Sequence, residues 1–389
     1  MDFNLSLEQR QFQDSVRRFA EAHLRPKARE RAREARFPWD VARLMAKQGL
    51  LGITVPESHG GQGGTLFDAV LAIEAVAAVC PRSADVVQAG NFGPLRTFAE
   101  YAPPQLRECY LPNLLAGETL IGLGMSEPEA GSAVTELRTT ATPDDDGYLV
   151  NGSKVFMTHS TDATCFLIYL RFGPGVDNIG SVLIPRDTSG VRIGKPVRYL
   201  SGEEWCQIYF EDCHVPASHV VLGPGGFKKQ IAGFNAERLG NASRALALGR
   251  YAFDVAREHA MTRRQFGRYL AEFQGLQWKF AEMEADLVAA RLALYQAAAG
   301  ADTGLPDAHA TAIAKYLCNK AGFAAANEAL QILGATGFSE ETLVDYCMRR
   351  TRGWMIAGGS MEILKNRIAE GVFGRAFFSA SRTREKRAE

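Results

Sequence analysis

The spacing of apolar residues divides the chain into three stretches, and the first of them is helical. Near its start, apolar side chains recur every three or four positions, at Phe12, Val16, Phe19 and Ala20, as on the buried face of a helix. Ser6 and Gln9 stand where a capping box would begin that helix. A turn-rich segment at 56–64 precedes a further helix, predicted over 65–79. We therefore expect an N-terminal helical domain over residues 1–120.

The second stretch is built from short runs typical of strands. Two runs flank the Asp/Gly-rich turn of LRTTATPDDDGYLVNGSKVFMTHS, and CFLIYLRF, GSVLIP and WCQIYFEDCHV follow. The runs are rich in β-branched and aromatic residues, and Gly, Pro and Asp separate them. Short strands at such intervals favour an antiparallel sheet or a small β-barrel. We assign them to a central β domain over residues 121–229.

The third stretch returns to helical spacing after the glycine-rich turn at 223–226 and keeps it to about residue 375. A face of small and apolar residues is formed by Ala242, Leu246, Gly249, Phe253, Ala256 and Ala260. Two more long helices are predicted, near 274–299 and 307–333. Small faces pack helix against helix, within a bundle or between subunits. The whole chain is thus an α+β protein of three units that ends in a C-terminal four-helix bundle domain over residues 230–389.

Composition excludes several classes of function. The chain has 44 basic and 44 acidic residues among 389, which argues against nucleic acid or an anionic membrane as partner. No apolar run approaches the roughly 20 residues of a membrane helix. The seven cysteines are spread without a CxxC pair, which is typical of thiols in a reducing compartment. We expect a cytoplasmic protein.

The motifs of several common cofactor sites are missing. No GxGxxG opens a βαβ unit and no GxxxxGK[ST] is present, which argues against nicotinamide and P-loop chemistry. HExxH is absent and the histidines are scattered, so we expect no metal site. The loop MSEPEAGSA at 125–133 is more informative, because Pro128 and Gly131 shape a turn that could offer the hydroxyls of Ser126 and Ser132 to a ligand. A plain acidic surface turn is the alternative.

An ordered set of motifs makes the chain similar to a known family. MSEPEAGS, GYLVNGSKVFMTHS, TRRQFG with EFQ, QILGATGF and IAGGSMEI follow one another as in acyl-CoA dehydrogenases. The resemblance spans the chain to about residue 375, and the family has the same helical, β, helical outline. It implies FAD as cofactor and an acyl-CoA thioester as substrate. It further implies a homotetramer built as a dimer of dimers, with electron-transfer flavoprotein as the electron acceptor.

The resemblance also implies residue roles at the flavin. Contacts to FAD within the chain would come from Met125, Ser126, Gly131, Ser132, Phe156, Thr158, Ser360 and Glu362. Contacts to the pyrophosphate and adenine would come from a neighbouring subunit, through Arg263, Phe266, Gln274, Gln331 and Gly334. A hydroxyl near flavin N5, as expected of Thr158, can stabilise negative charge on the reduced ring. Ser132 would lie near the ribityl chain or the phosphopantetheine arm of the substrate.

The catalytic base follows from a missing acid. Many members of the family carry a glutamate in an IYEGT segment, where this chain has Gly358 within IAGGS. The isovaleryl and long-chain branches place the acid earlier, in a segment resembling LERL, which this chain matches at 236–239. The resemblance thus makes Glu237 the base, with Arg238 beside it and Gly358 near the substrate. An ordinary surface ion pair of Glu237 with Arg238 is the alternative reading.

The acyl group is less well defined by the sequence. Arg82, with Ser83, Ala84, Val87 and Gln88, resembles a stretch of glutaryl-CoA dehydrogenases whose arginine binds a distal carboxylate, so a short, branched or dicarboxylic acyl chain is expected. The 3-sulfinopropionyl-CoA desulfinases share patterns like EPxAGSA and IAGGxxxIL with this chain and cleave a C–S bond without net oxidation. They carry an amide where Glu237 stands, so dehydrogenation is favoured. A non-catalytic flavin or acyl-CoA binding protein is a third reading.

Overall fold

The first unit of the fold consists of helices, two of which open with capping boxes. A computed structural model describes residues 4–301 and 304–377, and the predicted outer limits at residues 1 and 389 lie outside them. The helices are α1 (Leu7–His23), α2 (Ala28–Arg31), α3 (Trp39–Ala46), α4 (Leu66–Ala77), α5 (Ala84–Ala89), α6 (Gly93–Tyr101) and α7 (Pro104–Leu115). The predicted capping box of Ser6 and Gln9 is confirmed, and Thr65 with Asp68 forms a second one that begins α4.

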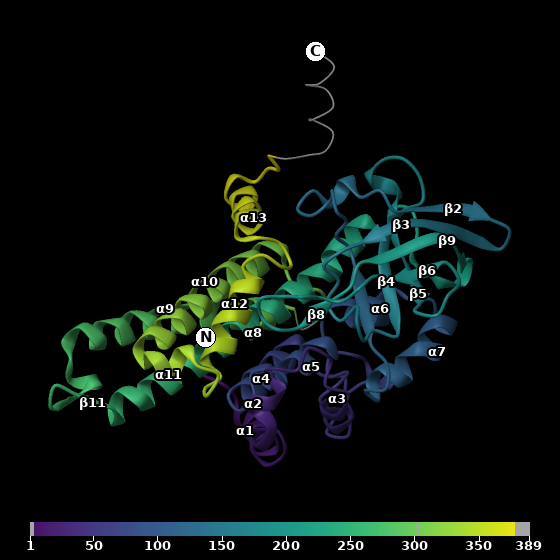
Figure 1. Ribbon diagram of the computed structural model, residues 1–389. Coiled ribbons are helices and arrows are strands. Elements are labelled where there is room, and N and C mark those ends of the chain that lie inside the picture. Colours follow the sequence, from purple (N-terminus) through teal and green to yellow (C-terminus); the bar gives the residue numbers. More distant parts are fainter. Residues whose placement is uncertain (1–3, 302–303, 378–389) are drawn as a thin grey trace.

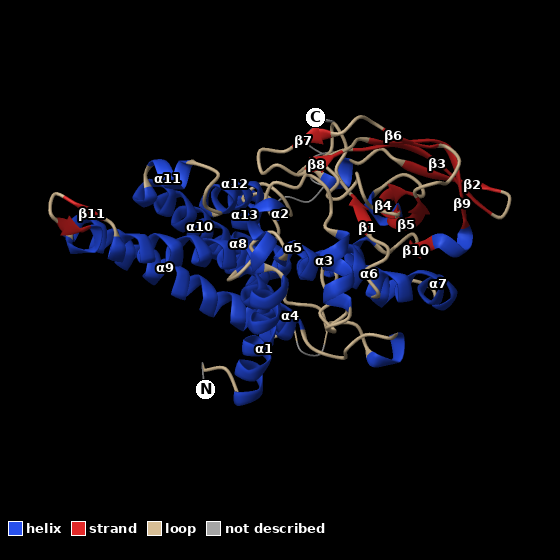
Figure 2. Ribbon diagram, turned by 60° about the horizontal axis from the view of Figure 1, so that its bottom comes forward, coloured by secondary structure: helices blue, strands red, loops and turns tan. Residues whose placement is uncertain are grey.

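The second unit is an eight-stranded sheet that stands at one end of the molecule (Figures 1 and 2). Its strands are β1 (Ile121–Gly124), β2 (Thr140–Asp144), β3 (Gly147–Lys154), β4 (Cys165–Arg171), β5 (Ile179–Pro185), β6 (Val191–Ile193), β9 (Ile208–Pro216) and β10 (Val220–Leu222). A separate small ribbon pairs β7 (Val197–Arg198) with β8 (Glu204–Trp205). The strand order is β10-β5-β4-β2-β3-β9-β6, with β1 also on β4.

The predicted sheet is confirmed, but the expectation that it is antiparallel or a small barrel was wrong in part. β1 pairs in parallel with β4 from Ile121 and Cys165 onward, and β2 meets β4 in parallel at Thr140 and Arg171. The described strands form an open, mixed sheet whose outer strands β10 and β6 do not pair with each other. Parallel neighbours need a crossover connection rather than a hairpin, and residue spacing within a strand does not reveal its partner's direction.

The third unit is the predicted helical bundle. It contains α8 (Phe227–Thr262), α9 (Gln274–Ala299), α10 (Ala308–Leu333), α11 (Ala335–Phe338), α12 (Val344–Trp354) and α13 (Met361–Phe373). A two-residue ribbon, β11 (Arg264–Gln265) with β12 (Arg268–Tyr269), lies at the tip of the bundle, far from the sheet (Figure 1). Single-turn 3-10 helices occur at Arg25–Lys27, Glu57–His59, Val134–Glu136, Val176–Asn178, Ala217–His219 and Leu270–Glu272.

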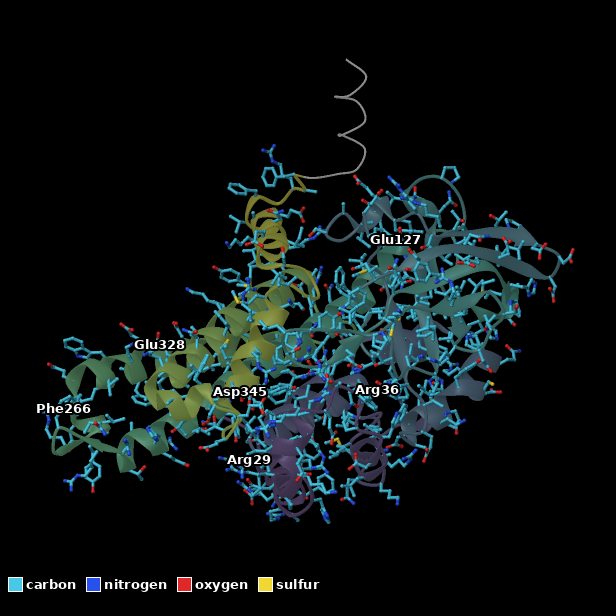
Figure 3. The ribbon with its side chains drawn as sticks, viewed as in Figure 1. Arg29, Arg36, Glu127, Phe266, Glu328 and Asp345 are labelled. Carbon is cyan, nitrogen blue, oxygen red and sulfur yellow. The ribbon has the colours of Figure 1, made fainter. Side chains whose placement is uncertain are left out.

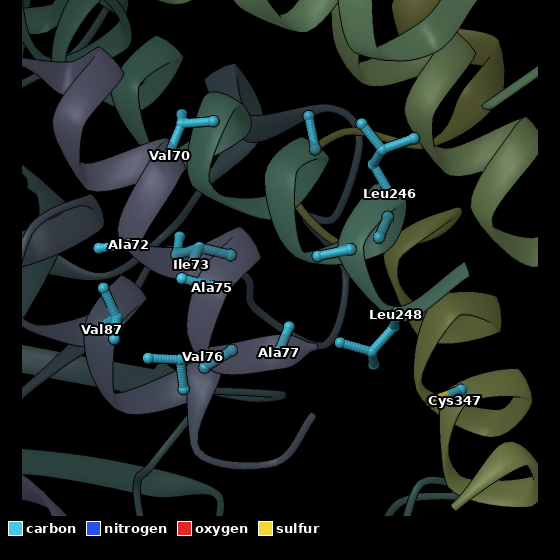
Figure 4. Close-up of a cluster of buried hydrophobic side chains, with 14 of the residues drawn as sticks. Val70, Ala72, Ile73, Ala75, Val76, Ala77, Val87, Leu246, Leu248 and Cys347 are labelled. Carbon is cyan, nitrogen blue, oxygen red and sulfur yellow. The ribbon is translucent and has the colours of Figure 1, made fainter. Parts of the chain in front are cut away.

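One helix, α8, connects the units. Its predicted small-residue face is buried within the bundle against α10, where a Cβ on Gly249 would lie 2.5 Å from the Cα of Gly322. The same helix packs Leu246 and Leu248 into a core shared with α4, as Figure 4 shows for Val70 and Ile73. Dry, close contacts of this kind hold α8 as a rigid rod. No described helix combines the length and apolar character needed to span a bilayer.

Candidate active site

Glu237 lies on α8 and is held by two side-chain amides. Its Oε1 accepts a hydrogen bond from Gln88 Nε2 at 2.8 Å and another from Asn241 Nδ2 at 3.2 Å. Arg238 turns away, donating to Asn235 Oδ1 at 2.9 Å and to the carbonyl of Gly358 at 3.2 Å. Within the described part of the chain Glu237 forms no ion pair with Arg238, so the surface-pair reading does not describe this carboxylate.

The surroundings of Glu237 adjust its proton affinity. Burial raises its pKa to about 7, while the hydrogen bond from Gln88 and the positive charge of Arg244 act in the opposite direction. A carboxyl group with this pKa is partly ionised at neutral pH and gains a proton readily. These are the properties of a general base.

Two glycines leave room around this carboxylate. Gly93, at the start of α6 with φ +58°, faces Glu237 Oε2 so closely that any Cβ there would collide with it. On the other side, a Cβ on Gly358 would lie 2.8 Å from Asn241 Nδ2. Both glycines have a left-handed backbone, Gly358 at φ +71°. Glycine at both positions therefore gives the carboxylate and its amide partner their space.

A buried lysine shapes the turn that contains Gly358. Lys315 Nζ donates to the carbonyls of Trp354 at 3.1 Å, Ala357 at 2.9 Å and Gly359 at 3.1 Å. Burial lowers its pKa to about 7, with Arg238 adding to that effect. Three carbonyls converging on one ammonium group fix the course of the turn beside α8.

Behind Gln88 lies a buried group of charges that we name the Asp85 cluster. Its members are Arg82, Asp85, His159, Glu203, Arg244 and Arg350. Asp85 binds Arg244 through Oδ1 and lies 3.7 Å from both His159 and Arg350. Burial alone would raise the pKa of Asp85, but the positive charges of Arg244, Arg82 and Arg350 outweigh it and hold that pKa well below the ordinary range. Arg244 Nη1 also donates to Gln88 Oε1 at 3.1 Å, which joins the cluster to Glu237.

Arg82 is an interior member of this cluster. Its side chain is 1% exposed, with Nη1 2.5 Å from Asp85 Oδ2 and 3.5 Å from Glu203 Oε1. Its Nη2 donates to the carbonyl of Arg36 at 3.2 Å. The guanidinium fork thus already faces the chain's own carboxylates. That Arg82 reads a substrate carboxylate stays a prediction, and such a carboxylate would have to take over these contacts.

The predicted flavin loop is anchored by a buried ion pair. Lys154 Nζ, at the end of β3, lies 2.6 Å from Glu127 Oε1 and donates to the carbonyl of Met125 at 3.3 Å. Glu127 also accepts from the backbone and hydroxyl of Thr139. Burial opposes ionisation of both partners and lowers the pKa of Lys154 to about 8, while Lys154 and these hydrogen bonds lower the pKa of Glu127. The pair holds the loop at 125–132 against the sheet.

The two predicted flavin segments lie side by side. The amide of Val155 donates to the carbonyl of Ser126 at 2.9 Å, which aligns the loop at 125–132 with the segment at 156–158. Phe156 and His159 both have left-handed φ angles, 54° and 60°. Non-glycine residues in this region store strain and concentrate at functional sites. Phe156 is exposed and packs on Trp205, with ring centroids 4.5 Å apart.

The side chains of this surface are accessible. Gly131, Ser132, Phe156 and Thr158 are exposed, and Met125 and Ser126 are half-buried. A Cβ on Gly131 would meet no atom within 4 Å. Ser360 caps α13 by accepting from the amide of Ile363 at 3.4 Å, and Glu362 follows it exposed.

The residues predicted to reach a neighbour's FAD lie elsewhere. Arg263, Phe266, Gln274, Gln331 and Gly334 are all exposed. Arg263 ends α8, about 39 Å along the helix from Glu237 at 1.5 Å per residue. Figure 3 places Phe266, 92% exposed, at the free tip of the bundle and Glu127 in the distant sheet domain. One chain therefore does not bring the two predicted FAD groups together.

Some residues of the site were not predicted from sequence. Asn241 follows Glu237 by one helical turn, and that spacing alone could have suggested contact. Gln88 had no such local indication, because its contact with Glu237 spans 149 positions. Gly93, Lys315 and Trp205 likewise owe their places to the tertiary fold.

The comparison with known protein families decides the identity of this fold. Residues 6–118 match the profile described as acyl-CoA dehydrogenase, N-terminal domain, residues 122–213 match its middle domain, and residues 224–373 match its C-terminal domain. The chain belongs to the acyl-CoA dehydrogenase family. It is an oxidoreductase, and its cofactor is FAD.

Relatives of this acyl-CoA dehydrogenase family member carry different activities. A 3-sulfinopropanoyl-CoA desulfinase of Paraburkholderia xenovorans is 33% identical over 380 residues, covering 96% of this chain and 97% of the relative. A short-chain-specific acyl-CoA dehydrogenase of Clostridium acetobutylicum is 31% identical over 378 residues, covering 96% and 100%. The structure of glutaryl-coenzyme A dehydrogenase with glutaryl-CoA superposes with a TM-score of 0.91 at 30% identity, covering 96% and 97%.

The described residues fit FAD on two separate surfaces. Accessible hydroxyls and backbone groups at 125–132 and 156–158 suit the polar edge of an isoalloxazine ring, and the aromatic pair of Phe156 and Trp205 suits its face. At the bundle tip, Gly334 would admit a phosphate backbone, because a Cβ there meets nothing within 4 Å. The described residues contain no group of three His, Cys, Asp or Glu side chains arranged for a metal ion.

Proposed function

We propose that this protein is an FAD-dependent dehydrogenase of acyl-CoA thioesters in which Glu237 removes the α proton. The observation that carries the proposal is the surroundings of Glu237, a carboxylate with a raised pKa of about 7 that accepts hydrogen bonds from two amides and faces the glycine at 93. No other acid is held in this way by paired amides among the described residues.

The reaction needs an acceptor for a proton and an acceptor for a hydride. FAD, when bound, would supply the acceptor for the β hydrogen and its electron pair, so that loss of this hydride and of the α proton leaves a Cα–Cβ double bond. Glu237 takes the α proton and becomes neutral. Desolvation favours that neutral form, which is why burial raises its pKa. The predicted hydroxyl of Thr158 would stabilise charge near the flavin, and Ser132 would guide the ribityl chain or the pantetheine arm.

The proposed cofactor site is completed by a second copy of the chain. Arg263 follows α8 about 39 Å along the helix axis from Glu237, and Phe266 comes after it in the chain. An FAD whose ring meets the substrate at Glu237 would therefore take these contacts from a neighbouring subunit. The 92% exposure of Phe266, a large apolar side chain, supports a partner at this tip. We infer a dimer of dimers, with electron-transfer flavoprotein as the acceptor of the reducing equivalents.

The finer proposal concerns the acyl group, which we infer to be short, branched or dicarboxylic. In the Asp85 cluster, two buried arginines and the half-buried Arg350 surround two buried carboxylates, and Nε and Nη2 of Arg244 have no hydrogen-bond partner among the described residues. Unpartnered buried donors favour a substrate or water with acceptor atoms. The second candidate function, desulfinase-like C–S cleavage, is supported by the 33% identity to a 3-sulfinopropanoyl-CoA desulfinase.

Anaerobic titration of the purified flavoprotein with a panel of CoA thioesters tests this function. Butyryl, isovaleryl, succinyl-type and 3-sulfinopropionyl thioesters are added, and the flavin absorbance and released sulfite are measured. Bleaching by one of them, lost in Glu237→Gln while FAD stays bound, supports dehydrogenation. Sulfite release from 3-sulfinopropionyl-CoA without bleaching would establish the lyase instead. Neither response would leave a flavin or acyl-CoA binding protein.

A further inference from the structure

Gln88 uses every hydrogen-bonding atom of its side chain. Its Nε2 donates to Glu237 Oε1 at 2.8 Å and to Asn241 Oδ1 at 3.1 Å, and its Oε1 accepts from Arg244 Nη1 at 3.1 Å. The side chain is 6% exposed. It stands on α5 and connects the base on α8 to the Asp85 cluster.

The orientation of both amides at Glu237 follows from Arg244. A guanidinium group only donates, so the atom of Gln88 that faces it must be the oxygen, and the nitrogen must face Glu237. A flipped amide would set two donors against each other at Arg244. Asn241 then follows, because its Oδ1 accepts from Gln88 and its Nδ2 is left to face Glu237.

Arg244 is itself fixed on two sides. It forms an ion pair with Asp85, which in turn binds Arg82. Its guanidinium stacks over the ring of Trp354, with 4.4 Å between Cζ and the ring centroid. Arg244 is 1% exposed, so water does not compete for these contacts. The hydrogen bonds that link Asp85 to Glu237 therefore have a fixed donor-to-acceptor direction, because a guanidinium group cannot accept a hydrogen bond.

The two oxygens of Glu237 consequently differ. Oε1 receives two N–H donors, and Oε2 faces Gly93 without a hydrogen-bond partner among the described residues. Two N–H donors satisfy this oxygen both as a carboxylate oxygen and as the carbonyl oxygen of the neutral acid, although they bind the carboxylate more strongly. A proton can therefore be added to Oε2 without moving either amide.

We propose that Gln88 is a positioning residue that fixes Glu237 so that Oε2 takes the α proton. This inference rests on the proposed role of Glu237 as the base. It assigns the reacting atom, and it explains how the base gains and loses a proton without rearrangement of its surroundings. Gly93 lacks the Cβ that would otherwise collide with Oε2 and displace it.

Other charged or titratable groups act on Glu237 as well. Those facing it from its own helix and from α5, α10 and β4 are Arg244, Asp85, Lys315 and Tyr169. The hydrogen bond from Gln88 stabilises the ionised form and so lowers the pKa of Glu237. Loss of this hydrogen bond should raise the pKa of Glu237 by about one to two units, because a hydrogen bond stabilises the charged form of its acceptor by a corresponding free energy.

The test is an infrared pH titration of the carboxyl band of Glu237 in the holoprotein, assigned by its absence in Glu237→Gln. In Gln88→Met the titration should move to higher pH by about one to two units. Gln88→Asn, which keeps the polarity but withdraws the amide, should move it in the same direction if Gln88→Met does not fold. Gln13→Met is the matched control, because Gln13 donates to another half-buried acid, Glu74, at 3.2 Å.

The outcomes separate this inference from the proposed function. If the Glu237 band titrates at the same pH in Gln88→Met, Gln88→Asn and the Gln13→Met control, the role of Gln88 is overturned. This holds even if a thioester bleaches the flavin. A shifted titration supports the positioning role, even if no thioester does so. Deuterium entry at the α-carbon of a bound thioester should show the same shift in its pH profile, and an unshifted profile would contradict Oε2 as the proton acceptor held by Gln88.

Discussion

A Cβ atom on Gly358 would lie 2.8 Å from Asn241 Nδ2, the nitrogen that donates to Glu237 Oε1. The turn that carries Gly358 and the helix that carries Glu237 therefore face one shared volume. A side chain at 358 would displace the amide that holds Glu237. The glycine there and the glutamate on α8 are thus two parts of one arrangement. Arg238, next to Glu237 in the chain, hydrogen-bonds to the carbonyl of Gly358 across 120 positions of sequence.

The rate of flavin reduction should depend on the ionisation of Glu237. Only the ionised carboxylate can accept the α proton, so the rate at saturating thioester should rise with pH through about 7 and then level off. Stopped-flow absorbance across the pH range measures this limb. A rate already constant from well below neutral pH would contradict the raised pKa.

Glu237 should also reduce stability above neutral pH. Burial raises its pKa from an ordinary 4.5 to about 7, so the folded state favours the protonated form. That contribution to stability is complete below the ordinary pKa and is lost as pH rises through about 7. Glu237→Gln should therefore increase Tm more at about pH 8 than at about pH 4. An equal change in Tm at both pH values would show that Glu237 titrates normally.

Gly93→Ala should impair catalysis through the position of the base. The new Cβ would collide with Glu237 Oε2, and the left-handed φ of +58° is unfavourable for alanine. A displacement of the base by about 1 Å can cost up to about 10²-fold in rate, and FAD content should stay unchanged. Gly353→Ala is the control, because its Cβ meets nothing within 4 Å. Equal turnover in the two variants would count against Oε2 as the reacting oxygen.

Lys154→Met should release the flavin loop. It leaves Glu127 buried without its cation, which costs about 3–5 kcal/mol of folding free energy and frees the carbonyl of Met125. FAD should dissociate more readily and Tm should fall, as measured by fluorescence of released flavin and by calorimetry. Arg192→Met is the control, since its pair with Glu211 is exposed and worth less than about 1 kcal/mol. Unchanged FAD affinity would show that the ion pair of Lys154 and Glu127 does not support cofactor binding.

Phe266→Glu should lower FAD content and disrupt the oligomer together. Phe266 is 92% exposed at the bundle tip, and a charge there would oppose burial against a partner. Light scattering gives the mass, and the ratio of flavin to protein absorbance gives the occupancy. Leu7→Glu, at another exposed apolar position, should change neither. A Phe266→Glu protein with full FAD occupancy and unchanged mass would refute the two-chain cofactor site.

The fold could be predicted where its causes are local. The capping box of Ser6 and the long helices over 274–299 and 307–333 come from nearby residues, and the structure has helices at Gln274–Ala299 and Ala308–Leu333. The parallel pairing of β1 with β4 could not be predicted, because Ile121 and Cys165 are far apart in sequence and are brought together by the tertiary fold. Strand periodicity specifies which face is buried and leaves the partner open.

The sequence indicated a candidate base and did not indicate the groups that hold it. The missing acid at 358 points to Glu237, whose role as the base stays a prediction, and burial in the structure raises the pKa of this carboxyl group. In the sequence, Gln88 cannot be distinguished from any other helix residue. Its importance comes from its hydrogen bonds to Glu237 and Arg244, which only the tertiary fold creates. Arg82 illustrates the converse, since its type suggested a ligand site while its neighbours Asp85 and Glu203 engage it inside the protein.

Helix α8 carries Glu237 in its N-terminal third, and Arg263 directly follows its last residue. Under the proposed two-chain cofactor site, one copy of this rod serves two active centres, its own through the base and its neighbour's through the dinucleotide contacts. Two inactive chains, one damaged at Glu237 and one at Phe266, would then form a mixed pair in which both lesions fall in the same centre. The other centre would be whole, so that two null alleles of this gene would complement each other.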